Sequence, residues 1–194
     1  MNISTVLRTL LTTSLVVATP AVFAHAGHTE SGLLAGFAHP FMGLDHIIVM
    51  FAIGLWAARL GGKAVVAVPM AFVTTMILAC ALTVIGVNVP FIEQGIITSV
   101  IFLGLFLAVS SRFSTSIGSA LVAVFAFFHG AAHGIEMPAD VSGSLYVIGF
   151  ASASALLHAT GVLFNTLLPA NSSVIIHRIS GALIALIGLS MAFG

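Results

Sequence analysis

The chain has 194 residues, of which 60% are apolar and only 5% are charged, and its five basic residues balance its five acidic ones. A soluble domain carries about 25% charged residues, so this composition excludes a water-soluble fold. The balanced charge gives no indication of a nucleic-acid partner. Cys80 is the single cysteine, which excludes a disulfide within the chain and a cysteine-based zinc cluster. We therefore expect an all-α polytopic membrane protein.

The first 24 residues are typical of a cleavable signal peptide rather than of the fold. Arg8 supplies a short positive region, residues 10–17 form an apolar core, and Pro20 breaks the chain before a run of small residues. The apolar core is too short to be a comfortable membrane span. We expect cleavage after Ala24, with cleavage after Ala26 as the alternative.

The remaining residues, 25–194, are predicted to form a single transmembrane domain of about six helices. Each apolar stretch is close to the roughly 20 residues that cross a bilayer core. Short breaks rich in Gly, Pro, Asn and Ser separate these stretches. No glycine-rich nucleotide-binding loop occurs, so ATP bound to this chain does not drive any transport. The expected spans are 32–58, 64–86, 91–110, 114–135, 142–167 and 173–193.

The distribution of charge predicts the orientation of these helices in the bacterial inner membrane. Removal of the signal peptide leaves the mature N-terminus in the periplasm, so the loops after the first, third and fifth helices are cytoplasmic. Those loops and their edges hold all basic residues of the mature chain, as the positive-inside rule requires: Arg59, Lys63, Arg112 and Arg178. The periplasmic side holds the acidic residues Glu30, Glu93, Glu136 and Asp140.

The first expected helix carries a carboxylate beside two histidines. His39 and His46 are seven residues apart and face nearly the same way on a helix, whereas Asp45 would point elsewhere. Pro40 removes a backbone hydrogen bond and Gly43 loosens the turn, so a kink there would bring the three side chains together or expose carbonyl oxygens to a cation. A charge at mid-membrane costs about 2.5–3.5 kcal/mol, which favours a functional role for Asp45.

The fourth expected helix carries a second cluster. His129, His133 and Glu136 occupy positions i, i+4 and i+7, so two imidazoles and a carboxylate share one stripe of the helix. Most of the residues between them are Gly or Ala, and small residues let a neighbouring helix approach closely. The spacing therefore predicts a site shared between this helix and another.

The expected topology orders these side chains from the periplasm inwards. Glu136 lies at the mouth, His39 and His129 lie in the outer half, and His46 lies near the middle of its span. His158, on the fifth expected helix, lies deeper still and is a candidate metal ligand; its alternative role is that of a hydrogen-bonding strut between helices. Such a graded series of ligands indicates an entrance route for a cation.

The other histidines are weaker candidates. His177 is next to Arg178 and is predicted to lie at the cytoplasmic interface, while His25 and His28 are either solvated or chelate a metal together with the N-terminal amine. The methionines are interpreted as packing residues. Imidazole and carboxylate ligands without thiolate suit nickel, cobalt or zinc better than Cu(I).

The two clusters resemble the motifs of the HupE/UreJ family. The segment from His39 to His46, with Pro40 and Gly43, is similar to the motif on that family's first helix, and the run from residue 128 to residue 136 is similar to its second motif. The resemblance covers essentially the whole chain. It implies a secondary permease that takes up nickel, or in some members cobalt, to supply metalloenzymes such as hydrogenase and urease. It also implies metal-binding roles for His39, Asp45, His46, His129, His133 and Glu136, whereas His158 is added from its position alone.

Three functions compete at this stage. In the first, a divalent cation enters down the membrane potential, which supplies about 2.3 kcal/mol per charge per 100 mV, and no ATPase is required. That hypothesis involves no enzymatic activity and no prosthetic group, and its partners are the transported Ni²⁺ or Co²⁺ and the lipid bilayer. The main alternative is an intramembrane metal-dependent hydrolase with zinc held by histidines and a carboxylate as general base. The third is a haem-binding cytochrome with a histidine pair across the first and fourth helices.

Overall fold

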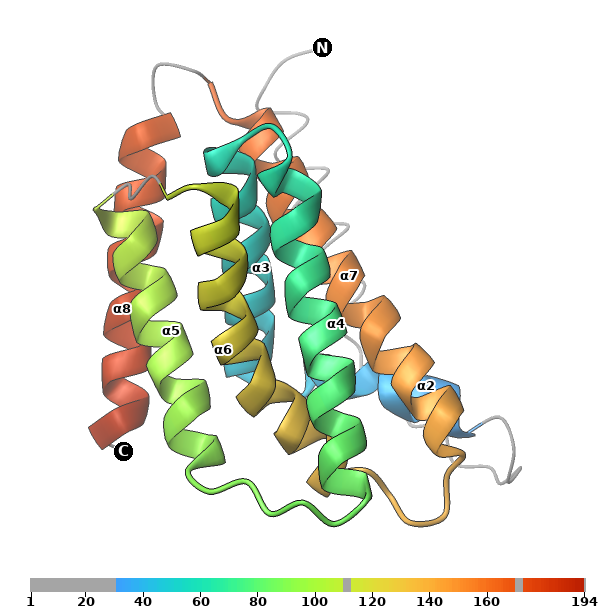
Figure 1. Cartoon of the computed structure of the whole chain (residues 1–194). Helices are drawn as coiled ribbons and strands as arrows, with labels where there is room; N and C mark the ends of the chain where they lie inside the picture. The colour runs from blue at the N-terminus through green and yellow to red at the C-terminus, as the bar shows by residue number, and fades with distance from the viewer. Residues whose placement is uncertain (1–30, 110–112, 170–172, 194) are drawn as a thin grey trace, which may run out of the picture.

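The computed structural model describes residues 31–109, 113–169 and 173–193, which form a helical bundle with no strand among these residues (Figure 1). The predicted signal peptide, His25, His28, Glu30 and Arg112 lie outside the described residues. The prediction of an all-α fold is confirmed for the part that is described. In chain order the elements are α2 (Ser31–Ala38), the 3₁₀ turn η1 (His39–Phe41), α3 (Leu44–Leu60), α4 (Ala64–Val84), α5 (Ile92–Ala108), α6 (Thr115–Ile135), α7 (Gly143–Leu167) and α8 (Ser173–Phe193).

The helices from α4 onwards begin and end within two residues of the spans expected from the sequence. Among the described residues, four helices (α4, α6, α7 and α8) are long and apolar enough to cross a membrane, and the bent pair α2–α3 raises this number to five. α5 is apolar but has only 17 residues. Length and composition therefore support four or five spans, against the expected number of about six.

The first expected span is broken into two helices. The segments Gly32–Phe41 and Leu44–Leu60 meet at a bend of 80°. Pro40 is the second residue of the 3₁₀ turn, where its missing N–H breaks the α-helical pattern, and Gly43 is extended (φ −102°, ψ 123°) immediately before α3. The predicted kink is confirmed. α3 begins at Leu44, so His46 lies in its first turn, directly after the bend. The expectation that His46 lies near the middle of the first span stays a prediction.

The helices pack as pairs: α3 against α7, α4 against α6, and α5 against α8, while α2 lies along the first half of α7 (Figure 1). Glycines permit the close crossings. A Cβ atom at Gly54 of α3 would overlap the backbone of His158 in α7, and one at Gly130 of α6 would overlap the backbone of Met76 in α4. The small residues of the second cluster therefore admit a neighbouring helix, as the sequence predicts, and that helix is α4.

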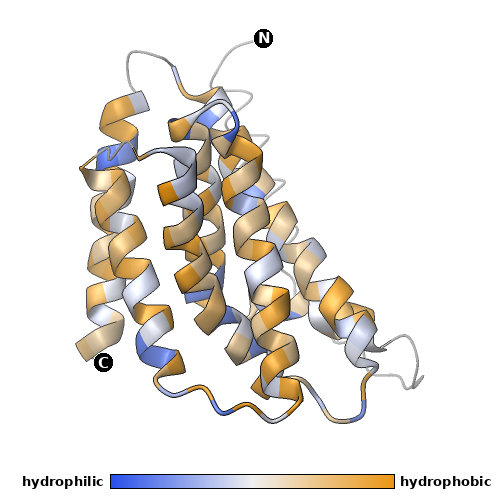
Figure 2. Ribbon diagram, viewed as in Figure 1, coloured by the Kyte–Doolittle hydropathy of each residue, from blue (hydrophilic) through white to orange (hydrophobic). Residues whose placement is uncertain are grey.

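Hydrophilic residues, blue on the ribbon, lie mainly towards the two ends of the bundle (Figure 2). Arg59 and Lys63 lie at the turn between α3 and α4, and Arg178 lies near the beginning of α8, at the same end because successive helices run in opposite directions. Glu93 begins α5 and Glu136 follows α6 at the other end. The described basic and acidic residues are therefore segregated as the topology prediction requires.

Candidate metal site

Four histidines from three elements meet where α3 begins and α6 ends. His39 comes from η1, His46 from the first turn of α3, and His129 and His133 from the last two turns of α6. The ring centroids of His39 and His133 are 4.7 Å apart, and the ring of His46 lies 5.0 Å from His129 and 5.1 Å from His133. The two clusters predicted from the sequence are therefore one site in the fold.

Asp45 holds the imidazole of His46 in a defined state. Its Oδ1 atom accepts a hydrogen bond from the backbone N–H of His46 at 2.9 Å and another from Nδ1 of the same residue at 3.0 Å. A carboxylate can only accept, so Nδ1 carries the proton and the neutral ring presents an Nε2 lone pair. That Nε2 atom is buried and has no hydrogen-bond partner. Asp45 therefore orients and polarises His46, which is the usual role of a carboxylate behind a metal-binding histidine.

His129 is fixed in the same tautomer by the backbone. Its Nδ1 atom lies 3.0 Å from the carbonyl oxygen of Phe125, which can only accept, so Nδ1–H donates and Nε2 presents a lone pair. This Nε2 atom is also buried and without a hydrogen-bond partner. His133 is buried with both nitrogens unpaired, and its ring stacks on Phe150 at 4.4 Å and 15°. The bundle thus presents unpaired imidazole nitrogens from α3 and α6 at one place.

One side of the site is closed by a polar contact between separate elements. His39 Nε2 lies 3.0 Å from Glu136 Oε2, which joins η1 to the end of α6. The Glu136 side chain is 52% exposed, whereas that of His39 is 19% exposed, so Glu136 stands at the rim as the sequence predicts. Tyr146 of α7 packs its ring 5.9 Å from that of His39.

A pocket of about 600 Å³ reaches this site between α3, α5 and α6. Asp45, His46 and Glu136 line it together with Glu93 from the first turn of α5. The remaining lining is apolar and includes Ile96, so three carboxylates and one imidazole provide the polar groups of the pocket. A cation that approaches His46 from this side meets negative charge first.

The donor set suits a borderline divalent cation. Neutral imidazole and carboxylate are ligands that nickel, cobalt and zinc accept, and none of the donors in the site is a thiolate. Among the described residues, no three His, Cys, Asp or Glu side chains form a group that could hold a metal ion as they are placed. Closure of the imidazoles around one ion therefore requires side-chain rotation.

Comparison with known proteins identifies the family. The sequence model of the HupE / UreJ protein family matches residues 13–191. Protein HupE of Rhizobium leguminosarum bv. viciae is 39% identical over 186 residues, which cover 95% of this chain and 97% of that protein. The chain belongs to the HupE/UreJ family. No solved structure matches it.

In this HupE/UreJ protein the fold separates two of the histidines from the site. Phe72 of α4 lies between His129 and His158, with ring centroids 5.5 Å and 5.2 Å from theirs. His177 is fully buried between the helices, and its Nε2–H donates to Oδ1 of Asn165 at 2.8 Å, joining α8 to α7. It lies near the beginning of α8, next to Arg178, and its position at the cytoplasmic interface stays a prediction.

Two features of the HupE/UreJ site escaped the sequence analysis. Glu93 was noted only as an acidic residue on the outer side, but α5 brings it to the same pocket as Asp45. The second feature is a pair of aromatic rings: Phe72 of α4 packs against His129, and Phe150 of α7 stacks on His133. Apolar spans contain many aromatic residues, and neither ring has a spacing that distinguishes it. Only the rarity of carboxylates in this chain gave a signal for Glu93.

Proposed function

We propose that this chain is a secondary transporter that takes up a divalent transition-metal cation, with nickel as the leading substrate and cobalt as the second. The metal supplies metalloenzymes such as hydrogenase or urease. Membership of the HupE/UreJ family supports this function. The observation that carries it is the meeting of four histidines from η1, α3 and α6 next to a pocket lined by three carboxylates.

In this proposal, ion capture follows the order in which the groups are reached from the pocket. The three carboxylates of the pocket, Asp45, Glu93 and Glu136, attract the hydrated cation, because several negative charges around a concave surface raise the local cation concentration. His46 and His129 then replace water ligands through their Nε2 lone pairs, and His133 and His39 complete the set. Asp45 partly neutralises the charge of the ion through His46, which lowers the cost of leaving water.

The membrane potential is the driving force in this proposal. Two positive charges that move inwards gain about 4.6 kcal/mol per 100 mV, from about 2.3 kcal/mol per charge. This corresponds to accumulation of roughly a thousandfold, since about 1.4 kcal/mol is a factor of ten. No nucleotide hydrolysis on this chain is needed for uptake.

The topology that goes with this function has six spans in the bacterial inner membrane. A signal peptide over residues 1–24 precedes a single transmembrane domain over residues 25–194, with the mature N-terminus in the periplasm. The segregation of Arg59, Lys63 and Arg178 from Glu93 and Glu136 supports this orientation. In this topology α3 and α5 each count as a span, and the pocket opens to the periplasm.

The test is uptake of radioactive nickel and cobalt by cells that express the chain, with the double variant Asp45→Ala/His46→Ala at matched membrane abundance. The control is Asp140→Ala, an exposed carboxylate in the loop between α6 and α7. Uptake of one metal by the wild type and the control, but not by the double variant, supports the function and selects the substrate. Failure of the wild type to raise uptake of either metal refutes it, and assays of metal-dependent hydrolysis would follow.

A further inference from the structure

His158 has a polar ring that the fold leaves without a partner. Its exposure is 1%, and neither of its ring nitrogens makes a hydrogen bond. A neutral imidazole always carries one N–H donor and one lone pair, and such groups are normally satisfied when buried. The alternative role of a hydrogen-bonding strut, left open by the sequence, has no bond to support it in the structure. The ring therefore faces a place where another polar species can bind.

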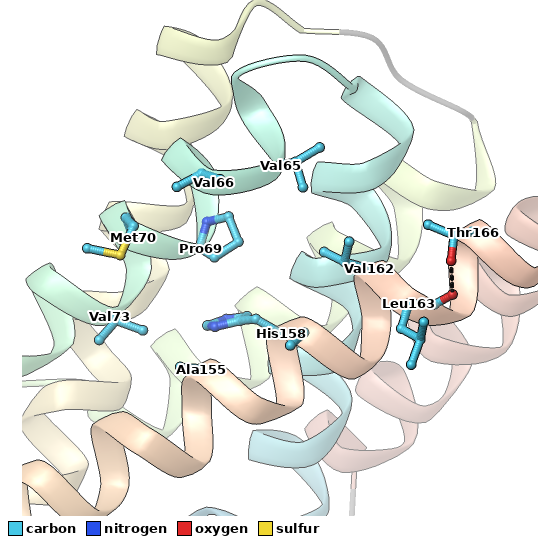
Figure 3. A pocket seen from close by; sticks show the side chains of 11 residues that line it. Val65, Val66, Pro69, Met70, Val73, Ala155, His158, Val162, Leu163 and Thr166 are labelled. Carbon is cyan, nitrogen blue, oxygen red and sulfur yellow. Dashed lines mark hydrogen bonds between the residues drawn. The ribbon is translucent and has the colours of Figure 1, made fainter.

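That place is a groove of about 470 Å³ between α4 and α7 (Figure 3). His158 projects from α7 towards Pro69 of α4, and the rest of the lining is almost entirely apolar. Pro69 has no N–H to give to the carbonyl of Val65, four residues earlier, and Val65 also lines the groove. The groove is therefore almost entirely apolar apart from the imidazole of His158, and Pro69 interrupts the helical hydrogen-bond pattern of α4 beside it.

The groove lies on the cytoplasmic side of the candidate site in the proposed topology. Its lining runs from His158 to Thr166, next to the last residue of α7, and back to Val65, the second residue of α4. The Phe72 ring contacts both His158 and His129, the innermost histidine of the candidate site. His158 is therefore the next nitrogen ligand along a line from the outer pocket towards the cytoplasm.

We propose that His158 is a second, inner binding station for the transported divalent cation, which passes from the outer histidines beside Phe72 and leaves through the groove between α4 and α7. This inference rests on the proposed transport function. The cation keeps part of its water shell at the station, and those water molecules supply its remaining ligands. An apolar path of this length is costly for a divalent ion, so a ligand midway lowers the barrier to crossing.

The inner station predicts a separation of binding from transport. The variant His158→Phe fills the same volume with an apolar ring, and His158→Gln retains a polar group that can ligate an ion. We expect His158→Phe to bind Ni²⁺ at the outer site with an affinity within twofold of the wild type, measured by calorimetry on purified protein. Its maximal uptake rate should fall at least tenfold with an unchanged half-saturating concentration, and His158→Gln should recover part of that rate.

Ser154→Ala is the matched control for loss of a buried polar group. Ser154 lies one turn before His158 in α7, is fully buried, and donates to the carbonyl of Phe150 at 2.7 Å. Its variant should transport at the wild-type rate once compared at equal amounts of folded protein.

Three results would overturn the inner station. His158→Phe could transport at the wild-type maximal rate, which would show that the ion does not bind in the groove. The rate and the outer-site affinity could fall together in both His158 variants, which would show that the ring only supports the outer site. A wild type that neither binds nor transports nickel or cobalt would refute the transport function itself, whereas the first two results leave that function intact.

Discussion

Substitution of Asp45 by Asn tests the idea that this carboxylate acts through His46. Asn has the same shape, so its oxygen can still accept from the His46 backbone, but it carries no charge and its amide can also donate. An amide that donates to Nδ1 moves the ring proton to Nε2 and removes the lone pair that faces the site. Both hydrogen bonds affected, at 2.9 Å and 3.0 Å, are present in the structure without a metal.

The expected magnitude follows from the role of such carboxylates in other metal sites. Loss of the group that orients a metal-binding histidine typically weakens metal affinity by about 10–100-fold. This corresponds to roughly 1.4–2.7 kcal/mol. The helix itself should persist, because a single charge in the first turn contributes only about 0.3–1 kcal/mol. We therefore expect weaker binding by a folded protein rather than loss of the protein.

The assay is nickel binding by calorimetry on detergent-purified protein, with nickel uptake by cells as the second readout. Asp140→Asn is the matched control, since it makes the same chemical change on the same side of the molecule at a residue that does not line the pocket. An Asp45→Asn variant that binds nickel within twofold of the wild type would refute the reasoning. An Asp140→Asn variant as weak as Asp45→Asn would show that general charge, not the Asp45–His46 contact, sets the affinity.

Further predictions concern the pocket, the packing and the orientation. Glu93→Gln should raise the half-saturating nickel concentration about fivefold at an unchanged maximal uptake rate, because an attraction between the carboxylate and the ion of about 1 kcal/mol is lost. An unchanged half-saturating concentration would show that the ion does not pass Glu93. Gly130→Ala should lower the free energy of unfolding in detergent by about 1–3 kcal/mol, because the new Cβ overlaps the α4 backbone. Gly143→Ala is the control and should leave that free energy almost unchanged, because only the flexible Met137 side chain is near. The orientation can be tested with single cysteines in a chain whose Cys80 is replaced by Ser. An impermeant thiol reagent should label Asp140→Cys in intact spheroplasts, but Lys63→Cys only in opened membranes. The reverse pattern would contradict the orientation.

Local features of the sequence were sufficient to predict most of the helices. Apolar length and turn residues placed the ends of α4 to α8 within two residues, because each signal lies inside the segment that it describes. The break in the first span was predicted for the same reason, since Pro40 and Gly43 act on the backbone where they stand. The stripe of His129 and His133 also follows from helical periodicity alone, and both residues are buried on one side of α6.

Contacts between distant helices could not be predicted in this way. Glu93 is 48 residues from Asp45 in sequence, and only the packing of α5 against α3 and α6 places both in one pocket. The place of His46 within its helix depends on where α3 begins, and the bend at Gly43 sets that starting point. The contact of Phe72 with both His129 and His158 depends on how α4 packs against α6 and α7, which the periodicity of α7 alone does not predict.

The short lengths of α3 and α5 have an electrostatic consequence. Each has 17 residues, about 25 Å at 1.5 Å per residue, which is less than the roughly 30 Å hydrocarbon core. Both border the acidic pocket, so in the proposed six-span topology the hydrophobic mismatch is greatest beside the candidate site, where lipid headgroups and water lie closer to the bilayer centre. The dielectric barrier is thinnest there, and the transmembrane voltage falls over a shorter distance. An ion that has reached the histidines therefore has a thinner layer of hydrocarbon still to cross than it would have beside the longer helices.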